Sequence, residues 1–524
     1  MILSDHSLRQ LDEPYIRSLP EDACRDLAVN LLIDLKTVRE RLNQDPSNSS
    51  VPPSSRLPWA PNDTCHDEAE ENGEGEDEKN EPEAEEIATD TSDEAIESKG
   101  EDKSGKESPA PKRNPGKQPG AQGYGRTQQL PVTAEIHHHV QCCGGCGHHA
   151  TEEENQVAWT GFYTIDVEIG TPGISVTNTK HIYYDLTCPC GHVTRQYPHQ
   201  EPDDPFWEGV GLGEWRLVGP MLSALIVSLA YRMRMSRARI REFLHDWLKI
   251  TLSIGTIQRC IEESARASAP VEEQLADEIA KSKLLHADET THKEKKLLLW
   301  LWVFVAQRTV LYYIGYRSNE IITNLLGESF PGWLMTDGLK VYRKYTSRLR
   351  CWAHLLRKAK GLEDSLEPKV QRFGKRIHEI LDLLMDAVYK AREGPPLGDL
   401  KQIHAHLLQE LRTLCTSMET CPHKKARELA REFLNDWEAI FAVLSHPHLP
   451  LTNNEAERLL RPLVILRRIS YGTRSENGTR ALALLASVVE TCRKRQLSPW
   501  PYLAQVISAR RCRQSVPPLP EPVG

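Results

Sequence analysis

No stretch of the sequence is apolar for long enough to cross a membrane. The best candidate, LLLWLWVFVA at 297–306, stops after ten residues at Gln307 and Arg308, whereas a membrane-spanning helix needs about 20. The opening residues, MILSDHSLRQLDEP, lack the apolar core of a secretory signal. The sequence therefore predicts a protein without a membrane partner.

Cysteine is too sparse for a protein built on disulfides. Thirteen cysteines are spread over 524 residues, and several of them are clustered at spacings typical of a metal site. Disulfide scaffolds belong mainly to small secreted domains. We therefore predict a reducing, cytoplasmic environment.

Acidic charge is concentrated in one segment. The net charge is −9, but residues 61–100 hold 17 Asp and Glu against two Lys, a local charge of −15. Subtracting −15 from −9 leaves +6 for the rest of the chain. The protein is therefore mildly basic outside this segment, which is compatible with a polyanionic partner.

Composition divides the first 130 residues into two parts. Residues 1–45 carry an apolar stripe that predicts a helix from Glu21 to Gln44. This helix either dimerises like a leucine zipper or packs on its own chain. Residues 46–130 are acidic and then rich in Pro, Gly and Lys, which predicts a disordered linker. Its acidic part either competes for basic faces of the protein or is an inert spacer.

Residues 131–200 contain two cysteine pairs about forty residues apart. Each pair lies in a turn-like segment followed by Gly. Four thiolates on two such turns can bind zinc tetrahedrally and leave no open position for catalysis. The sequence predicts a small structural zinc ribbon, and the alternative is a metal-free sheet with buried thiols. The predicted Zn²⁺ ligands are Cys143, Cys146, Cys188 and Cys190.

Residues 213–282 are predicted to be helical and are rich in arginine. Ser236 and Ser253 are placed to cap two successive helices joined by a short turn. This pattern is typical of a helix-turn-helix that enters the major groove of DNA, and the alternative is a helical hairpin with a solvated charged face. Arginines there would bind phosphates. The predicted DNA contacts are Arg232, Arg234, Arg237, Arg239 and Arg241.

The second half of the chain begins with short β-type runs and continues with helical periodicity. This order predicts an α/β core at 283–505, with a helical insertion at 355–450 and a C-terminal tail at 506–524. The expected strands lie at 284–288, 297–306, 310–316 and 333–337, and CWAH (Cys351 to His354) is a further candidate strand.

Three separated acidic residues form the candidate catalytic site. Asp288 ends the first β-type run, Asp337 ends the last one, and Glu457 lies near the start of a predicted helix. Carboxylates gathered in this way can bind Mg²⁺ or Mn²⁺, and two such ions can clamp the attacking and leaving oxygens of a phosphodiester. A single Asp at a strand end is usually a cap or turn residue, so spacing alone does not identify the site.

The motifs around these acids resemble those of one family. HADET, MTDGLKVYRKY, CWAHLLRK and LTNNEAERLLRP occur in this order and are followed by GTRALALLASVVETCRKRQLSPWPYL. Together they resemble the transposases of insertion sequence family 66. The likeness includes LNQDPSNSSVPPSS, PGKQPGAQGYGR and VGPMLSALIVSLAYRMRMS, so it covers nearly the whole chain except the acidic insert around 61–108.

The resemblance implies an RNase H-like catalytic core with a DDE triad. Asp288, Asp337 and Glu457 would form the triad and hold two Mg²⁺ or Mn²⁺ ions. His354 would lie near this site, where it either contacts the scissile phosphate or forms a buried structural pair. The segment ILRRISYGTRS departs from many relatives, which have Arg-Lys-Asn and an aromatic residue there; this puts the local contacts to DNA ends in doubt.

The predicted helix of Glu457 carries further candidate residues. Asn453, Asn454 and Arg461 share a face with Glu457. Together with Arg458, they either orient Glu457 and bind phosphate or serve as caps and surface pairs. The predicted DNA contacts of this helix are Arg458, Arg461, Arg467 and Arg468.

We therefore predict a bacterial, nucleoid-associated DNA transposase. By resemblance, it would bind the terminal inverted repeats of its element, hydrolyse a phosphodiester to expose a 3′-hydroxyl, and direct that hydroxyl at target DNA. Pairing of two ends implies a homo-oligomer, and proteins encoded by the same element are candidate accessory partners. The alternatives are a noncatalytic DNA-binding regulator or domesticated derivative, a subunit that is inactive without helpers, and a nuclease that cuts without joining.

Overall fold

The computed structural model describes residues 11, 13–42, 130–151, 155–171, 173–394 and 398–521. The predicted linker at 46–130 lies outside them except for its last residue. Near the N-terminus, α2 (Glu13–Ser18) precedes α3 (Glu21–Leu42), which begins where the sequence predicts a helix. Among the described helices, none combines the length and the apolar character that a bilayer crossing requires.

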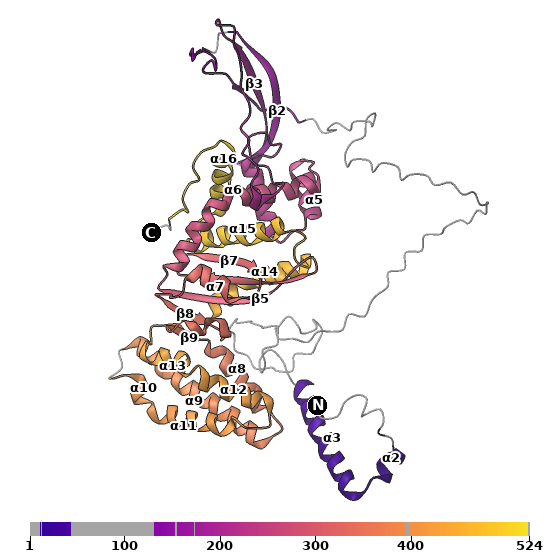
Figure 1. The fold of residues 1–524 in the computed structure, drawn as a ribbon, viewed down its shortest axis with the longest axis vertical. Helices are drawn as coiled ribbons and strands as arrows, with labels where there is room; N and C mark the ends of the chain where they lie inside the picture. The colour runs from indigo at the N-terminus through magenta and orange to yellow at the C-terminus, as the bar shows by residue number, and fades with distance from the viewer. Residues whose placement is uncertain are drawn as a thin grey trace, which may run out of the picture. The chain divides into compact units, whose positions relative to one another are not determined.

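The first sheet carries the cysteine turns. β2 and β3 pair antiparallel along most of their length, while β1 lies parallel to β3 and β4 lies antiparallel to it. β2 and β3 are the long strands of Figure 1. The bounds are β1 (Ala134–His138), β2 (Gln156–Ile169), β3 (Ile174–Thr187) and β4 (Val193–Arg195).

A helical segment follows, as predicted for 213–282. Ser236 and Ser253 cap α5 and α6, because their side chains accept hydrogen bonds from the backbone N–H groups of Arg239 and Thr256. Lys249, in the left-handed region at φ 55°, ends α5 and starts the turn between the two helices. The elements are η2 (Pro205–Trp207), α4 (Pro220–Val227), the π-helical turn η3 (Ser228–Arg232), α5 (Arg237–Leu248) and α6 (Ile254–Ala280).

The second sheet has five strands in the order β7-β6-β5-β8-β9. β7, β6 and β5 are antiparallel neighbours, whereas β5, β8 and β9 are parallel. β7 is an edge strand, and its backbone N–H groups at Val310 and Tyr312 donate to the hydroxyls of Thr491 and Ser487. The elements are β5 (Leu284–Glu294), β6 (Leu297–Val305), β7 (Val310–Gly315), α7 (Asn319–Leu326), β8 (Trp333–Thr336), η4 (Lys340–Lys344) and β9 (Arg348–Arg350).

Two local expectations about this sheet are wrong. Asp288 does not end its strand, because β5 continues to Glu294 and pairs with β6 throughout. The β-branched residues Thr290 and Thr291 extend the hairpin beyond the apolar run. CWAH is not a strand either: β9 ends at Arg350, and Cys351 is the N-cap of a helix.

The predicted helical insertion is present and has its own apolar core. Large side chains such as Phe373, Phe433 and Phe441 are buried in it. A smaller cluster joins Met335 of β8 and Leu349 of β9 to Ala442 of the insertion. Its helices, drawn in orange in Figure 1, are α8 (Trp352–Glu363), α9 (Pro368–Glu393), α10 (Leu400–Ile403), α11 (Ala405–Met418), α12 (Lys424–Asn435) and α13 (Trp437–Ser445).

Three helices complete the described chain: α14 (Asn454–Ser470), α15 (Glu476–Lys494) and α16 (Pro499–Arg511). α16 continues past residue 505, where the tail was predicted to start. Arg511 near its end is buried and donates two hydrogen bonds to the carboxylate of Glu263 on α6. The fold class is therefore mixed α/β, as predicted.

Candidate functional site

β5 and β8 bring Asp288 and Asp337 to neighbouring positions. The parallel register pairs His286 with Met335. Continued by two residues, this register places Asp288 level with Asp337, directly after β8 ends at Thr336. Adjacent strands in a sheet lie about 4.8 Å apart. Two acids separated by 49 positions in the sequence thus come to one place on the sheet.

A buried tyrosine lies within the electrostatic reach of both aspartates. Tyr342 in η4 is fully buried. Burial raises the pKa of its phenol well above the ordinary value, and the negative charges of Glu289, Asp337 and Asp288 raise it further. Asp288 and Asp337 therefore converge on the same part of the core.

The turn after β8 fixes the backbone of Asp337. The Oδ1 atom of Asp337 accepts a hydrogen bond from the backbone N–H of Leu339 at 3.2 Å. Gly338 between them has φ +113°, a conformation that side chains rarely adopt. The chain therefore turns sharply at the predicted site.

Asn453 attaches the start of α14 to β5 and to the start of α8. Its side-chain amide donates to the carbonyl of Ala287 at 3.0 Å, next to Asp288, and its Oδ1 lies 3.2 Å from His286 Nδ1. Its backbone N–H donates to the thiol of Cys351 at 3.2 Å. Asn453 is the N-cap residue of α14, but its side chain makes no capping hydrogen bond. It instead anchors the helix of Glu457 beside β5.

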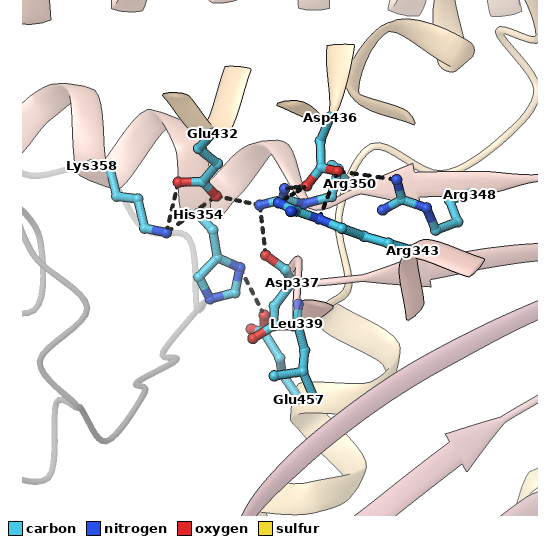
Figure 2. Close-up of polar contacts among 10 residues, drawn as sticks. All are labelled: Asp337, Leu339, Arg343, Arg348, Arg350, His354, Lys358, Glu432, Asp436 and Glu457. Carbon is cyan, nitrogen blue, oxygen red and sulfur yellow. Dashed lines mark hydrogen bonds and ion pairs between the residues drawn. The ribbon is translucent and has the colours of Figure 1, made fainter. Parts of the chain in front are cut away.

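The carboxylate of Glu457 is buried, and few neighbouring groups stabilise its negative charge. Its side chain is 8% exposed, and neither carboxylate oxygen accepts a hydrogen bond from any described residue. The nearest recorded charge partner is His354, whose Nδ1 lies 3.5 Å from Glu457 Oε1 (Figure 2). Burying a carboxylate without donors is costly, so this donor set fits a bound cation.

His354 and Cys351 stand beside Glu457 at the start of α8. One ligand atom from each of the three residues lies within 4.8 Å of the others. Burial alone would raise the pKa of the Cys351 thiol, but the charge and hydrogen bonding of His354 hold it below the ordinary value. The structure thus places the predicted accessory residue His354 next to the predicted Glu457.

The cysteine turns of the first sheet bring four thiols together. The sulfurs of Cys143 and Cys190 are 3.7 Å apart and those of Cys146 and Cys188 are 3.6 Å apart. All four lie within 4.8 Å of one another. Thiolates about 2.3 Å from a tetrahedral zinc are about 3.8 Å from each other. This group is therefore compatible with a structural zinc ion.

Comparison with known proteins identifies the family. A sequence model described as "Transposase IS66 family" matches residues 216–481, which is half of the chain. The chain belongs to the IS66 transposase family.

Curated relatives are similar over shorter stretches. An uncharacterized protein, y4jO, of Sinorhizobium fredii (strain NBRC 101917 / NGR234) is 30% identical over 156 residues, 29% of this chain and 46% of the relative. A second one from the same strain, y4qI, is 24% identical over 266 residues, 45% of this chain and 49% of the relative. The chain thus spans about half the length of the curated relatives it matches.

The arginines predicted to bind DNA in this IS66-family chain differ in their surroundings. Arg239 and Arg241 are exposed on α5, and Arg461 and Arg468 are exposed on α14. Arg234 is half-buried. Four more of these arginines contact other residues of the protein. Arg232 pairs with Glu490, Arg237 donates to Gln258, Arg458 pairs with Glu455, and Arg467 donates to Thr290 and Thr291 of β5.

Sequence reasoning missed an ionic network that reaches Asp337 through Arg350. Arg343, Arg348 and Arg350 contact Asp436 of the insertion, and Arg350 also contacts Glu432 (Figure 2). The local signal was RKYTSRLRC, a segment with three arginines and one lysine directly before α8. The partners, about 90 residues away, were not predictable from that signal.

Proposed function

We propose that this IS66-family protein is a DNA transposase that acts as a metal-dependent polynucleotidyl transferase. The observation that carries the proposal is the junction of β5, β8 and α14. There the register of β5 and β8, continued by two residues, brings Asp288 level with Asp337. Asn453 anchors α14, which bears the buried carboxylate of Glu457, to Ala287 next to Asp288. Three carboxylates brought to this junction could share divalent cations.

We interpret the second sheet as an RNase H-like core. Its strand order and directions support this interpretation, because three antiparallel strands precede two parallel ones and the first strand is central. The helical insertion lies between Asp337 and Glu457, as expected for this branch of DDE enzymes from the resemblance of the motifs.

In the proposed mechanism, Asp288, Asp337 and Glu457 would hold two Mg²⁺ or Mn²⁺ ions. When bound, such ions lower the pKa of an attacking water and offset the charge of the leaving oxygen. Asn453 keeps α14 against β5, and His354 lies where it can contact a phosphate beside Glu457. The same carboxylates would serve hydrolysis at the element end and attack of the 3′-hydroxyl on target DNA.

We propose that DNA is bound by a helix-turn-helix formed by α5 and α6 and by the exposed face of α14. The exposed arginines Arg239, Arg241, Arg461 and Arg468 are suited to phosphate contacts. The zinc module would act as a structural unit. The partners would be the terminal repeats and the target DNA, in a bacterial cytoplasm, with accessory proteins of the element as further candidates.

We also propose that α3 contributes to a homo-oligomer. Leu32 and Leu35 on this helix are 52% and 60% exposed in the single chain. Removing residues 1–45 should lower the mass measured by light scattering, and an unchanged mass would remove this role.

A strand-transfer assay tests the proposed function. Purified protein is incubated with Mg²⁺ or Mn²⁺, a labelled element end and a supercoiled target. We expect joined products with the natural protein and their loss with Asp288→Asn, Asp337→Asn and Glu457→Gln, by about 10³-fold or more. The matched control is Glu455→Gln on the same helix, which should retain the products.

The same assay separates the alternatives. Cleavage without joining would indicate a nuclease. Binding of the element end without any chemistry, even after addition of the element's accessory proteins, would indicate a noncatalytic regulator and contradict the proposal.

A further inference from the structure

A buried ionic network joins the insertion to the turn that carries Asp337. Arg350 lies at the end of β9, opposite Thr336 of β8 in the parallel register. Its side chain is 1% exposed. It donates to Asp436, to Glu432, and at 2.8 Å to the main-chain carbonyl of Asp337 (Figure 2). One guanidinium thus contacts the insertion and the candidate site.

In the described part of the chain, the two carboxylates that form ion pairs with Arg350 both belong to the insertion. Glu432 lies on α12, and Asp436, whose side chain is fully buried, is the residue between α12 and α13. Burial would lower the pKa of Arg350, but the charges of Glu432, Asp436 and Asp337 raise it above the ordinary value. The guanidinium is therefore a permanent cation in a fixed place.

Gly338 shows how closely Arg350 approaches the turn. A Cβ atom at Gly338 would collide with the guanidinium of Arg350. The hydrogen bond goes to the carbonyl of Asp337 rather than to a carboxylate oxygen. Arg350 can thus hold the backbone of Asp337, and the carboxylate of Asp337 takes no part in that hydrogen bond.

The network also contains a second buried arginine, Arg348, whose hydrogen bond goes to Asp436. Arg348 is 9% exposed, and its Nη2 donates to Asp436 Oδ1 at 3.0 Å. Arg348 and Arg350 therefore share a carboxylate partner, a strand and a buried environment. They differ in two contacts of Arg350, the hydrogen bond to the turn after β8 and the ion pair with Glu432.

We propose that Arg350 is a positioning residue for Asp337 and that the insertion, through Glu432 and Asp436, sets the metal affinity of the catalytic site. This inference rests on the proposed function, because it takes Asp337 as a metal ligand. Residues that orient metal ligands typically change metal affinity by about 10- to 100-fold when they are removed. The insertion would then be part of the catalytic apparatus, beyond its role as a separate helical core.

The test measures Mn²⁺ binding to the full-length protein by electron paramagnetic resonance, without DNA. Asp288→Asn is the reference for the metal site, Arg350→Met is the test, and Arg348→Met is the matched control. We expect both arginine variants to lower Tm. Only Arg350→Met should raise the Mn²⁺ dissociation constant, by about 10- to 100-fold. Where Arg350→Met does not fold, Glu432→Gln replaces it and should weaken binding in the same direction.

The outcomes distinguish this inference from the proposed function. If Asp288→Asn weakens Mn²⁺ binding but Arg350→Met or Glu432→Gln binds as Arg348→Met does, the positioning role is overturned while the metal site stands. If Asp288→Asn leaves binding unchanged, the metal site itself is absent, and the positioning role is lost with it.

Discussion

At the scale of single residues, the unusual feature is the carboxylate of Glu457, which is buried and accepts no hydrogen bond from the described part of the chain. Glu457 lies beside His354 and Cys351, and no described residue donates a hydrogen bond to its oxygens. Its neighbour in the sequence, Glu455, is balanced by Arg458 and Lys494. Of two acids on one helical turn, one is therefore stabilised by basic side chains and the other is buried with little stabilisation of its charge. Such a difference is typical of a site at which function is favoured over stability.

We expect Glu457→Gln to stabilise the metal-free protein. The amide removes a buried charge that accepts no hydrogen bond from the described residues, so the free energy of unfolding should rise by about 1–3 kcal/mol. Thermal unfolding with and without Mn²⁺ measures this: the variant should melt higher without metal and gain nothing when metal is added. Glu455→Gln is the control and should melt slightly lower than the natural protein. A lower Tm for Glu457→Gln would show that its charge is already balanced.

A second prediction at this scale concerns His292. Its side chain is buried, and its Nε2 lies 3.0 Å from Thr473 Oγ1. Burial, helped by the charge of Arg467, lowers the pKa of His292 to about 4.

Because the unfolded imidazole has a pKa near 6.5, the unfolded state binds more protons between pH 4 and 6.5. Stability contributed by neutral His292 is therefore lost as pH falls through this range, by about 2 kcal/mol between pH 7 and pH 5. Urea unfolding at both values should show a smaller loss for His292→Gln than for the natural protein. Equal losses would mean that His292 is accessible to protons in the folded state.

At the scale of elements, the loop after α14 is tied to the β5–β6 hairpin. The backbone of Thr473 exchanges hydrogen bonds with Lys293 and Lys295. Gly472 precedes it with φ +93°, and a Cβ there would collide with the carbonyl of Lys293. This contact fixes the far end of the helix that carries Glu457.

Gly472→Ala should therefore destabilise the protein by more than about 1 kcal/mol, because both its conformation and its space exclude a side chain. Differential scanning calorimetry checks this against Gly170→Ala, where an added Cβ meets nothing within 4 Å. Similar Tm values for the two variants would show that the loop relaxes away from the hairpin.

Helix caps and strand ends differ in how well the sequence predicts them. The caps of α5 and α6 were predictable, since Ser236 and Ser253 act on neighbouring backbone groups. The end of β5 was not, because the polar residues after Asp288 form a strand only through pairing with β6. Local chemistry fixes caps, whereas strand length depends on a partner.

At the scale of the whole molecule, the site is assembled from segments that are distant in sequence. The family motifs supplied Asp288, Asp337 and Glu457 as candidates. The contacts that support them were not predictable, because Arg350 and Asp436 are 86 positions apart and no local pattern links them. Long-range charge pairs of this kind follow from packing of the insertion on β8 and β9.

The zinc module gives a prediction at this scale. The purified protein should contain one zinc per chain, and Cys143→Ser with Cys188→Ser should lose it and expose residues 131–200 to protease. The second sheet should stay folded, because its core does not include these cysteines. Cys142→Ser, just outside the four-thiol group, is the control and should keep the metal. Zinc-free natural protein with an intact module would contradict this account.

The most direct test of the account is the position of a divalent cation in a crystal of the protein bound to an element end and Mn²⁺. Anomalous scattering at the manganese edge locates the ions independently of activity. We predict peaks within coordination distance of Asp288, Asp337 and Glu457. Manganese bound elsewhere, with these three carboxylates uncoordinated, would contradict the central claim.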